Sequence, residues 1–265
     1  MRVTKEQLKT LCLIAKAAAR EIMSVYGNRA ETWLKDDSSP LTEADLNADR
    51  VIRRELEKLF PGFFILSEES ASTGCKDQNT FFLVDPLDGT KEFLKRNDEF
   101  TVNIALVNKG QVIVGVVLAP ALGQLFYAAR GLGAWVCEGQ RIRALRVSSY
   151  QALTPLRVIG SRSHGGEALS AWLARLPEEH TFVEVGSSLK FCRIAEGQAD
   201  IYPRFGPTSQ WDTAAAQCVL EMAGGAVVDL AGRRLRYGLE RSVLNPEFVA
   251  LGSPSLISLF DQEAE

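Results

Sequence analysis

The sequence predicts a layered α/β protein made of two halves of different character. A long amphipathic helix is expected over residues 4–26, where apolar residues recur at helical spacing. Several β segments separated by short turns are expected within residues 100–137. Across residues 156–251 predicted strands and helices alternate, which is typical of an α/β arrangement. We therefore expect an α+β half over residues 1–143 and an α/β half over residues 144–265.

The composition is that of an ordinary soluble globular protein. The 265 residues are 46% hydrophobic and 24% charged, which allows a substantial core. The formal net charge of −3 provides no global positive field, so a nucleic acid polymer is not an expected partner. The polar start predicts no signal peptide, and no apolar run approaches the roughly 20 residues that span a bilayer. We expect a cytoplasmic protein. Peripheral association with the inner membrane stays open, as does the choice between monomer and homodimer.

The cysteines indicate neither a disulfide framework nor a zinc knuckle. Their number is odd and no CxxC pair occurs; they are Cys12, Cys75, Cys137, Cys192 and Cys218. Cys12, Cys192 and Cys218 fall in apolar helical patterns, so they are expected to be small core residues. This usage fits a reducing compartment.

The elements of the first half begin with the helix to Tyr26, for which Thr4 is the expected N-cap and Gly27-Asn28 the C-cap. A second helix is expected over 43–60, because Pro61-Gly62 would stop it. The predicted strands are 63–66, 81–84, 100–108, 111–119, 124–129 and 134–137. Lys109-Gly110 predicts a hairpin turn. Residues 138–154 are polar and expected to be irregular, which places the junction between halves there.

The second half is predicted from its alternation of short apolar runs and helical patterns. The expected strands are 156–159, 181–185, 199–202, 226–229 and 248–251. The expected helices are 166–176, 187–196 and 209–223.

The stretch Asp85-Pro86-Leu87-Asp88-Gly89-Thr90 is the most informative of the chain. It follows a buried apolar run, and its proline should end the strand while its glycine permits a tight turn. Thr90 would then open a short helical turn whose free backbone amides suit a phosphate group. The two carboxylates would repel each other unless a cation lay between them, which indicates hard divalent cations on oxygen ligands. The alternative is an ordinary turn, because Asp, Pro and Gly are common turn residues.

Three further carboxylates stand at the ends of predicted elements. Glu68 follows a short strand, whereas Asp45 and Asp212 lie in the first turns of two helices. Taken singly, each has an ordinary explanation: a solvated loop for the glutamate, and stabilisation of the helix dipole for the aspartates. Their joint placement around one aspartate-rich turn favours a common site.

Four stretches resemble the signatures of the lithium-sensitive, magnesium-dependent phosphomonoesterases, the superfamily of inositol monophosphatase and fructose-1,6-bisphosphatase. They are residues 39–45 (SPLTEAD), 67–70 (SEES), 85–90 (DPLDGT), and the Trp211-Asp212 pair with 221–225 (EMAGG). The resemblance covers nearly the whole chain, with the signatures in the correct order. It implies a layered αβαβα sandwich of the inositol monophosphatase-like type.

Three other stretches are similar to the bacterial 3'(2'),5'-bisphosphate nucleotidases of the CysQ type. They are 91–93 (KEF), 186–191 (GSSLKF) and 202–207 (YPRFGP). A substrate with a second phosphate needs additional cations, and Lys190 and Arg204 lie in these stretches. The inositol monophosphatases have small or apolar residues where Lys190 stands, and an acidic residue shortly before the Trp-Asp pair where Arg204 stands.

The resemblance implies the role of each site residue. Two or three Mg²⁺ ions would be bound by Glu68, Asp85, the Leu87 carbonyl, Asp88 and Asp212. Asp45 and Thr90 would orient the attacking water, with Glu68 also placed at the catalytic centre. The amides of Gly89 and Thr90 would hold the scissile phosphate. The other residues implied on the substrate side are His164, Ser187, Lys190 and Arg204, while Glu68, Leu87, Asp88 and Asp212 would face the substrate through the metal site. His164 has the alternative of a surface-loop histidine, Lys190 that of a snorkelling lysine, and Arg204 that of a structural residue.

The implied function is hydrolysis of the 3'-phosphate of adenosine 3',5'-bisphosphate to AMP and phosphate, with a metal-activated water attacking phosphorus in line. 3'-Phosphoadenylyl sulfate shares that phosphate and is a second candidate substrate, and the implied role is in sulfur assimilation. Two alternatives stay open: an inositol monophosphatase or other small sugar phosphatase of the same superfamily, and a non-catalytic nucleotide-binding regulator.

Overall fold

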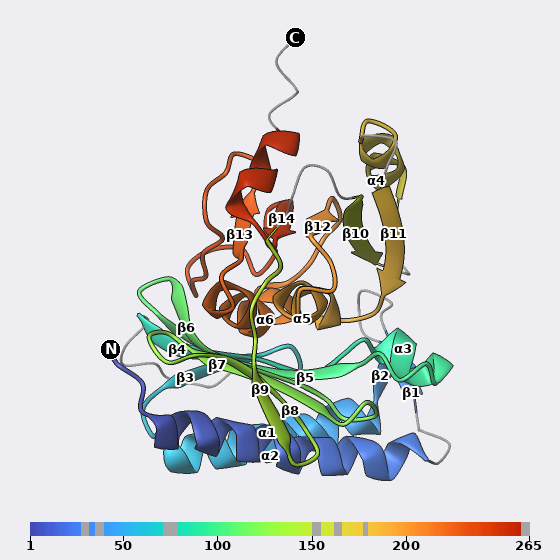
Figure 1. The fold of residues 1–265 in the computed structure, drawn as a ribbon. Coiled ribbons are helices and arrows are strands. Elements are labelled where there is room, and N and C mark those ends of the chain that lie inside the picture. The colour runs from blue at the N-terminus through green and yellow to red at the C-terminus, as the bar shows by residue number, and fades with distance from the viewer. Residues whose placement is uncertain are drawn as a thin grey trace.

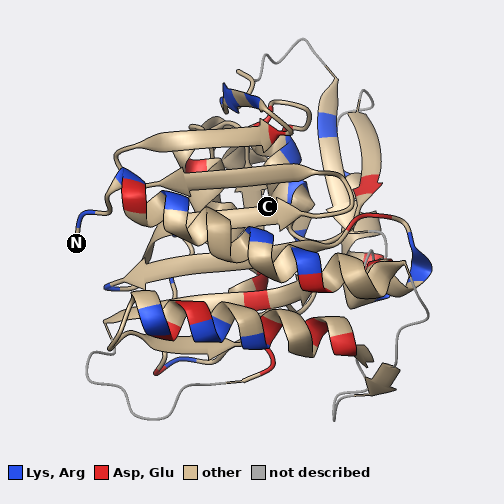
Figure 2. Ribbon diagram, turned by 90° about the horizontal axis from the view of Figure 1, so that it is seen from below, with Lys and Arg blue, Asp and Glu red and all other residues tan. Residues whose placement is uncertain are grey.

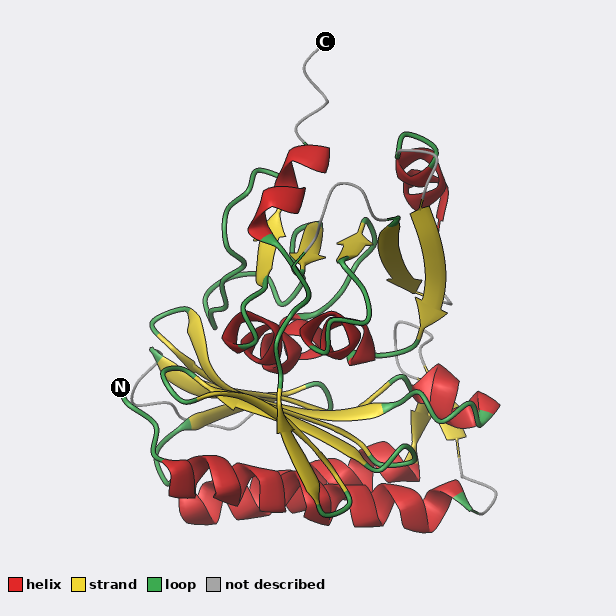
Figure 3. Ribbon diagram, in the orientation of Figure 1, coloured by secondary structure: helices red, strands yellow, loops and turns green. Residues whose placement is uncertain are grey.

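The computed structural model describes residues 1–27, 32–34, 40–70, 79–149, 155–161, 166–176 and 180–260. Its elements form five stacked layers, helices alternating with sheets, as Figures 1 and 3 show. From the bottom of Figure 1 these are two long helices, a seven-stranded sheet, two central helices, a five-stranded sheet and an outer layer of short helices. The predicted αβαβα sandwich is thereby confirmed.

The seven-stranded sheet has the order β3-β4-β5-β6-β7-β8-β9. Its strands are β3 (Phe64–Ser67), β4 (Thr80–Asp88), β5 (Thr101–Asn108), β6 (Gln111–Ala119), β7 (Gln124–Ala129), β8 (Gly133–Glu138) and β9 (Arg141–Ala144). Helices α1 (Lys5–Tyr26) and α2 (Glu43–Leu59) cover one face, while α5 (Leu189–Ala195) and α6 (Gln210–Met222) cover the other. Strand β4 is buried on both sides: Phe82 and Val84 pack towards α1 and α2, whereas Phe81 and Leu83 pack towards α5 and α6.

The five-stranded sheet has the order β11-β10-β12-β14-β13 and is mixed. Its strands are β10 (Leu156–Ser161), β11 (His180–Val185), β12 (Ile201–Arg204), β13 (Ala226–Asp229) and β14 (Phe248–Leu251). The pairs of β10 with β11 and β12 are parallel, and those of β14 with β12 and β13 are antiparallel. The outer face packs against α4 (Gly166–Leu173) and the 3-10 helix η1 (Pro254–Leu259). A small hairpin of β1 (Thr32–Leu34) and β2 (Pro40–Thr42) precedes α2, and α3 (Thr90–Lys95) follows β4.

Strand β9 corrects the expectation that residues 138–154 are irregular. Residues 141–144 pair antiparallel with β8 and extend the first sheet by one strand. The strand escaped prediction because its alternation places arginines at Arg141 and Arg143, and Ile142 is largely exposed, so no apolar run marks it. The division of the chain into halves at residues 143 and 144 stays a prediction.

Smaller corrections concern the ends of elements. Helix α4 ends at Leu173, three residues before its predicted end, and β12 covers 201–204 instead of 199–202. Gly27 ends α1 in a right-handed conformation, and Asn28 lies outside the described residues. Cys12, Cys192 and Cys218 are buried, as expected, and Cys75 lies outside the described residues.

The outer surface formed by α1 and α2 carries charges of both signs. In Figure 2, which views this surface from below, blue and red residues are interspersed along the helices. Among the described residues, none of the helices has both the length and the apolar character needed to cross a membrane.

At Gly115 strand β6 and helix α6 approach each other closely. A Cβ atom there would lie 2.1 Å from the carbonyl oxygen of Ala215 and 2.8 Å from Cβ of Cys218. Because backbone atoms cannot give way cheaply, Gly115→Ala is expected to lower the free energy of unfolding by about 1–3 kcal/mol. Differential scanning calorimetry checks this loss. Gly27→Ala is the control, since its Cβ would meet nothing within 4 Å. Equal melting temperatures for wild type and Gly115→Ala would contradict the close approach.

Candidate active site

A cavity of about 300 Å³ opens where β4 and β12 end and where α3, α5 and α6 begin. It is lined by ten of the residues singled out in the sequence, among them Glu68, Asp85, Leu87, Asp88, Gly89, Thr90, Ser187 and Asp212. Lys190 and Arg204 line it as well. Elements from both halves of the chain therefore form one cleft.

Strand β4 positions Asp85 and Asp88 by a bulge. The expected strand end at Val84 was wrong, because β4 continues to Asp88 with a shift of register: Asp85 pairs with Asn103, and Asp88 with Thr101. Pro86 has no N–H to give to the ladder. The N–H of Leu87 instead donates to Oδ1 of Asp85 at 3.1 Å. The extra residue aims both carboxylates into the cleft.

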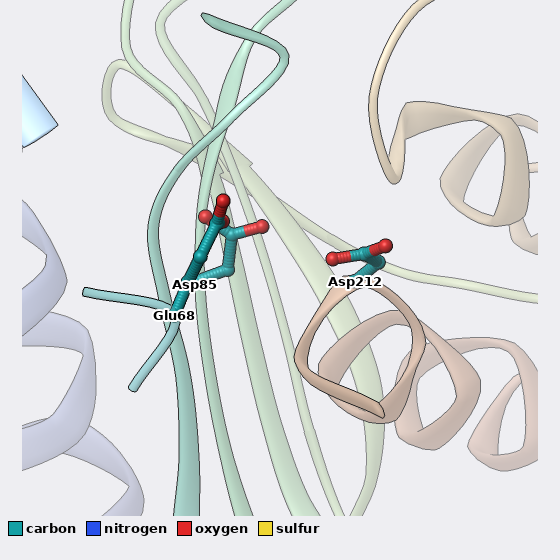
Figure 4. A group of neighbouring side chains, drawn as sticks. All are labelled: Glu68, Asp85 and Asp212. Atoms are coloured by element: carbon teal, nitrogen blue, oxygen red, sulfur yellow. The ribbon is translucent and has the colours of Figure 1, made fainter. Parts of the chain in front are cut away.

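Two capping boxes position Asp45 and Asp212. Each aspartate is the third residue of its helix, and its Oδ2 accepts the N–H of the N-cap residue at 2.8 Å, Thr42 for α2 and Ser209 for α6. Each aspartate thus has a structural role at a helix start, a capping box, beside the helix-dipole explanation considered from the sequence. The second oxygen has a different direction: Oδ1 of Asp45 accepts the Thr90 hydroxyl at 3.2 Å. One oxygen of Asp212 points towards Glu68 and Asp85 (Figure 4).

Glu68 is held beside β4 by the turn that follows β3. Its N–H donates to the Val84 carbonyl at 3.1 Å. On either side of it, the hydroxyls of Ser67 and Ser70 donate to the two oxygens of Asp49 on α2, at 2.5 and 2.7 Å. Asp49 was not among the predicted site residues. It fixes the loop that carries Glu68.

Glu68, Asp85 and Asp212 converge. Each offers one carboxylate oxygen, and these three oxygens lie within 4.8 Å of one another (Figure 4). Asp88 and the Leu87 carbonyl line the same cavity. Oxygen ligands at this separation match the coordination that hard divalent cations take in proteins. The cluster could therefore hold such a cation.

The electrostatics of the cluster favour protonated or metal-bound carboxylates. Burial and the charges of Glu68, Asp88, Asp212 and Asp45 raise the pKa of Asp85 well above its ordinary value. Burial, with the charges of Asp88 and Glu68, does the same to the pKa of Asp212. For Asp88 burial raises the pKa to about 6, although the Lys190 charge and the Ser188 N–H oppose it. A bound cation would offset both the burial of these carboxylates and their mutual repulsion, and so favour their ionised forms.

A pH dependence of stability follows for the metal-free protein. The folded state holds these protons at a pH where an unfolded aspartate, with a pKa of about 3.9, has lost them. The resulting stabilisation is complete below about pH 4 and is lost as pH rises through about 6, the folded pKa of Asp88. We expect the melting temperature in chelator to fall between pH 5 and 8, and a divalent cation to remove most of this fall. Scanning calorimetry with and without the cation checks this, and identical pH profiles would contradict it.

Gly89 and α3 form the surface next to the carboxylates. Gly89 has φ +91°, a left-handed conformation, and a Cβ there would lie 3.2 Å from the Glu99 carbonyl oxygen. The first-turn amides of α3, including that of Thr90, have no carbonyl four residues earlier within the helix. They are suited to bind a phosphate group beside the cluster.

Two of the predicted nucleotide-side residues, Lys190 and Arg204, line the cavity but already have protein partners. Lys190 is 6% exposed; its Nζ donates to the Val185 and Ser187 carbonyls and lies 5.2 Å from the Tyr202 ring centre. Burial lowers its pKa to about 8. Arg204 donates to the carbonyls of two loop residues, Gly206 at 3.2 Å and Pro207 at 2.7 Å.

His164 lies outside the described residues. Ser187 also lines the cavity, with φ +48°. This left-handed residue explains why α5 starts at Leu189 and not at the predicted position.

Three buried polar residues next to Asp88 were missed by the sequence analysis: Thr101, Asn103 and Ser188. A signal existed for one of them. Asn103 interrupts the apolar run of β5 with an amide, and a buried amide requires hydrogen-bond partners.

Most of the chain matches known proteins. The model of the "Inositol monophosphatase family" matches residues 4–261. The "3'(2'),5'-bisphosphate nucleotidase CysQ" of Salmonella typhimurium is 47% identical over 245 residues, covering 91% of this chain and 98% of that protein. The protein of the same name from Escherichia coli K12 is 46% identical with the same coverage.

Solved structures agree with this match. The crystal structure of CysQ from Bacteroides thetaiotaomicron, described as a bacterial member of the inositol monophosphatase family, superposes with a TM-score of 0.77 at 34% identity, covering 91% of this chain and 96% of that one. The extragenic suppressor protein suhB from Bartonella henselae superposes with a TM-score of 0.82 at 28% identity, covering 97% and 98%.

Proposed function

The chain belongs to the inositol monophosphatase family, and we propose that within it this protein is a 3'(2'),5'-bisphosphate nucleotidase. The observation that carries this assignment is the convergence of Glu68, Asp85 and Asp212 in a chain so similar to nucleotidases of the CysQ type. A non-catalytic binding protein would gain nothing from a costly cluster of like charges. The protein is therefore a phosphoric monoester hydrolase.

The proposed reaction removes the 3'-phosphate of adenosine 3',5'-bisphosphate and yields AMP and phosphate. 3'-Phosphoadenylyl sulfate, which carries the same phosphate, is a further proposed substrate. Both compounds belong to the activation and transfer of sulfate, so the proposed role is in sulfur assimilation. The cytoplasmic location stays a prediction.

The family's phosphatases depend on metal ions, and the proposed cofactor here is Mg²⁺, with two or three ions in the cleft. Glu68, Asp85, Asp88, Asp212 and the Leu87 carbonyl would hold them. Carboxylate and carbonyl oxygens are the donors that Mg²⁺ prefers. When bound, the ions supply Lewis-acid polarisation of the phosphoryl oxygens and lower the pKa of water.

The remaining chemistry belongs to side chains and amides of the cleft. Because Thr90 donates its hydroxyl proton to Asp45, its oxygen lone pairs can accept from a water molecule beside the phosphate. The pair would thereby fix the direction of the attacking water. The amides of Gly89 and Thr90 would hold the phosphate and so set its position relative to that water.

A side-by-side assay tests the function. The purified protein is given adenosine 3',5'-bisphosphate and inositol 1-phosphate at equal concentrations with Mg²⁺, and released phosphate is measured. Preferential turnover of the nucleotide is expected. Preference for the inositol phosphate would establish the sugar phosphatase alternative. Turnover of neither, with the nucleotide still bound in calorimetry, would establish the binding regulator.

Lys190 is the proposed contact to the second phosphate. Its ammonium has three N–H donors, and the Val185 and Ser187 carbonyls take two of them. Lys190→Ala is expected to raise KM for adenosine 3',5'-bisphosphate about ten- to a hundredfold, the loss of one charge-assisted hydrogen bond. KM for adenosine 3'-monophosphate, which lacks the 5'-phosphate, should change much less. Steady-state kinetics on both substrates test this contact. An equal rise in KM for both would mean that Lys190 only supports the loop.

A further inference from the structure

We propose that Thr101, Asn103 and Ser188 are positioning residues that clamp one oxygen of Asp88 and thereby direct its other oxygen to the metal and phosphate site. The inference deepens the proposed function and rests on it for its kinetic consequences. The three residues come from both halves of the chain: two from β5, and Ser188 from the turn before α5.

The clamp consists of two side chains and one backbone amide, from residues hidden from solvent. Thr101, Asn103 and Ser188 are 0%, 1% and 2% exposed. All of its donors reach the same oxygen, Oδ2 of Asp88. The Ser188 N–H lies 2.6 Å away, and Nδ2 of Asn103 and the Thr101 hydroxyl each lie 3.3 Å away. An oxygen with three donors around it has little capacity left for another ligand.

The hydrogen-bond directions inside the clamp are determined by one another. The Ser188 hydroxyl donates to Oδ1 of Asn103 at 2.8 Å, which leaves the amide nitrogen of Asn103 facing Asp88. The Thr101 and Ser188 hydroxyl oxygens are 2.9 Å apart. Because the Ser188 proton goes to Asn103, the Thr101 hydroxyl is the donor of this pair and shares its one proton between the Ser188 oxygen and Oδ2 of Asp88. A closed network of this kind holds its members in single rotamers.

The turn that presents Ser188 is itself anchored. Ser187 adopts φ +48°, a conformation that costs a residue with a Cβ about 1–3 kcal/mol. Lys190 donates to the Ser187 carbonyl, and the Gly186 N–H donates to Oε2 of Glu99 at 2.8 Å. Such strain persists only where surrounding contacts enforce it, and here it brings the Ser188 N–H onto Asp88.

The consequence concerns the aim of the carboxylate. Rotation about the terminal torsion of an aspartate is broad, so an unclamped Asp88 could exchange or tilt its two oxygens. A ligand must be held within about 0.5 Å of its productive position to act fully. Loss of the clamp should therefore weaken metal binding and lower kcat, with little effect on KM for the nucleotide.

The test uses Thr101→Val, Thr101→Ser and Asn103→Leu in the full-length protein. Mg²⁺ affinity is measured by isothermal titration calorimetry, alongside kcat and KM for adenosine 3',5'-bisphosphate. Mutation of a residue that hydrogen-bonds to a metal ligand typically lowers metal affinity or activity ten- to a hundredfold. Asn103→Leu should therefore weaken Mg²⁺ binding and lower kcat by about that factor. Thr101→Val should follow in the same direction, and Thr101→Ser should restore both quantities because it keeps the hydroxyl.

Asn108→Ala is the matched control on the same strand. Its amide donates to the Thr80 hydroxyl at 2.8 Å, away from the cleft, so the variant should lose stability while keeping Mg²⁺ affinity and kcat. Mg²⁺ affinity and kcat within twofold of wild type for both Thr101→Val and Asn103→Leu would overturn the proposal. Should the wild type fail to hydrolyse the nucleotide, the proposed substrate is wrong, and the calorimetric Mg²⁺ affinities still decide whether the clamp exists.

Discussion

Asp85→Asn is expected to lower kcat by on the order of a thousandfold, about 4 kcal/mol of transition-state stabilisation. Asp85 is 1% exposed and contributes an oxygen to the cluster with Glu68 and Asp212. The substitution keeps the shape of the side chain but removes the charge that attracts a divalent cation. Because the cation neutralises charge that develops on the phosphoryl oxygens, its loss should fall mainly on kcat.

The same substitution is expected to raise the melting temperature of the metal-free protein. Burial and four neighbouring carboxylates raise the pKa of Asp85, so its ionised form is unfavourable in the fold without a cation. A neutral amide removes that repulsion, and each kcal/mol relieved corresponds to roughly 2–4 °C for a chain of this size. Opposite signs for activity and metal-free stability are the signature of a residue that is retained for its chemistry.

Phosphate release and scanning calorimetry in chelator measure the two quantities. Asp229→Asn is the control, because Asp229 pairs with Arg233 on the surface and takes no part in the cleft. It should leave kcat unchanged. A folded Asp85→Asn variant with kcat near that of wild type would end the metal assignment, and a fall in its metal-free melting temperature would mean that Asp85 supports the fold.

The carboxylates proposed to hold metal could be singled out from the sequence because their placement depends on local structure. Asp45 and Asp212 are each fixed by a capping box that spans four residues, and Asp85 and Asp88 by a bulge around one proline. Such devices can be recognised within a short window of sequence. The order of the signatures then implied that these windows meet in space.

What could not be predicted depends on contacts between segments far apart in the chain. Ser188 reaches Asp88 across 100 positions, and nothing near either residue marks the other. Lys190 differs, because its carbonyl partners lie only three and five residues earlier, in the turn before its helix. A lysine in an apolar helix indicates that some partner exists, but the left-handed turn that presents these carbonyls has no clear mark in the sequence. Strand β9 was missed for a different reason, since an edge strand with exposed arginines lacks an apolar pattern.

Thr90→Val is expected to lower kcat about a hundredfold while KM changes by no more than a few fold. The half-buried Thr90 hydroxyl donates to Oδ1 of Asp45 at 3.2 Å, and valine preserves the branched shape without that hydroxyl. Orientation of the attacking water matters in the transition state more than in the substrate complex, and a positioned proton acceptor contributes about 10²–10⁴-fold. Asp45 is a less clean target, because its other oxygen caps α2 and its removal would also destabilise the helix.

Steady-state kinetics and thermal unfolding of Thr90→Val and Thr90→Ser separate the explanations. Serine keeps the hydroxyl and should recover most of kcat, whereas alanine at the same position should behave as valine does. If valine raises KM and leaves kcat unchanged, Thr90 contributes to phosphate binding and not to the direction of the water. If serine lowers kcat as much as valine does, the methyl group is needed as well as the hydroxyl, and the assignment to the hydroxyl alone is wrong. The pair of Thr90 and Asp45 is assigned to orientation of the attacking water only if kcat falls with valine and is recovered with serine.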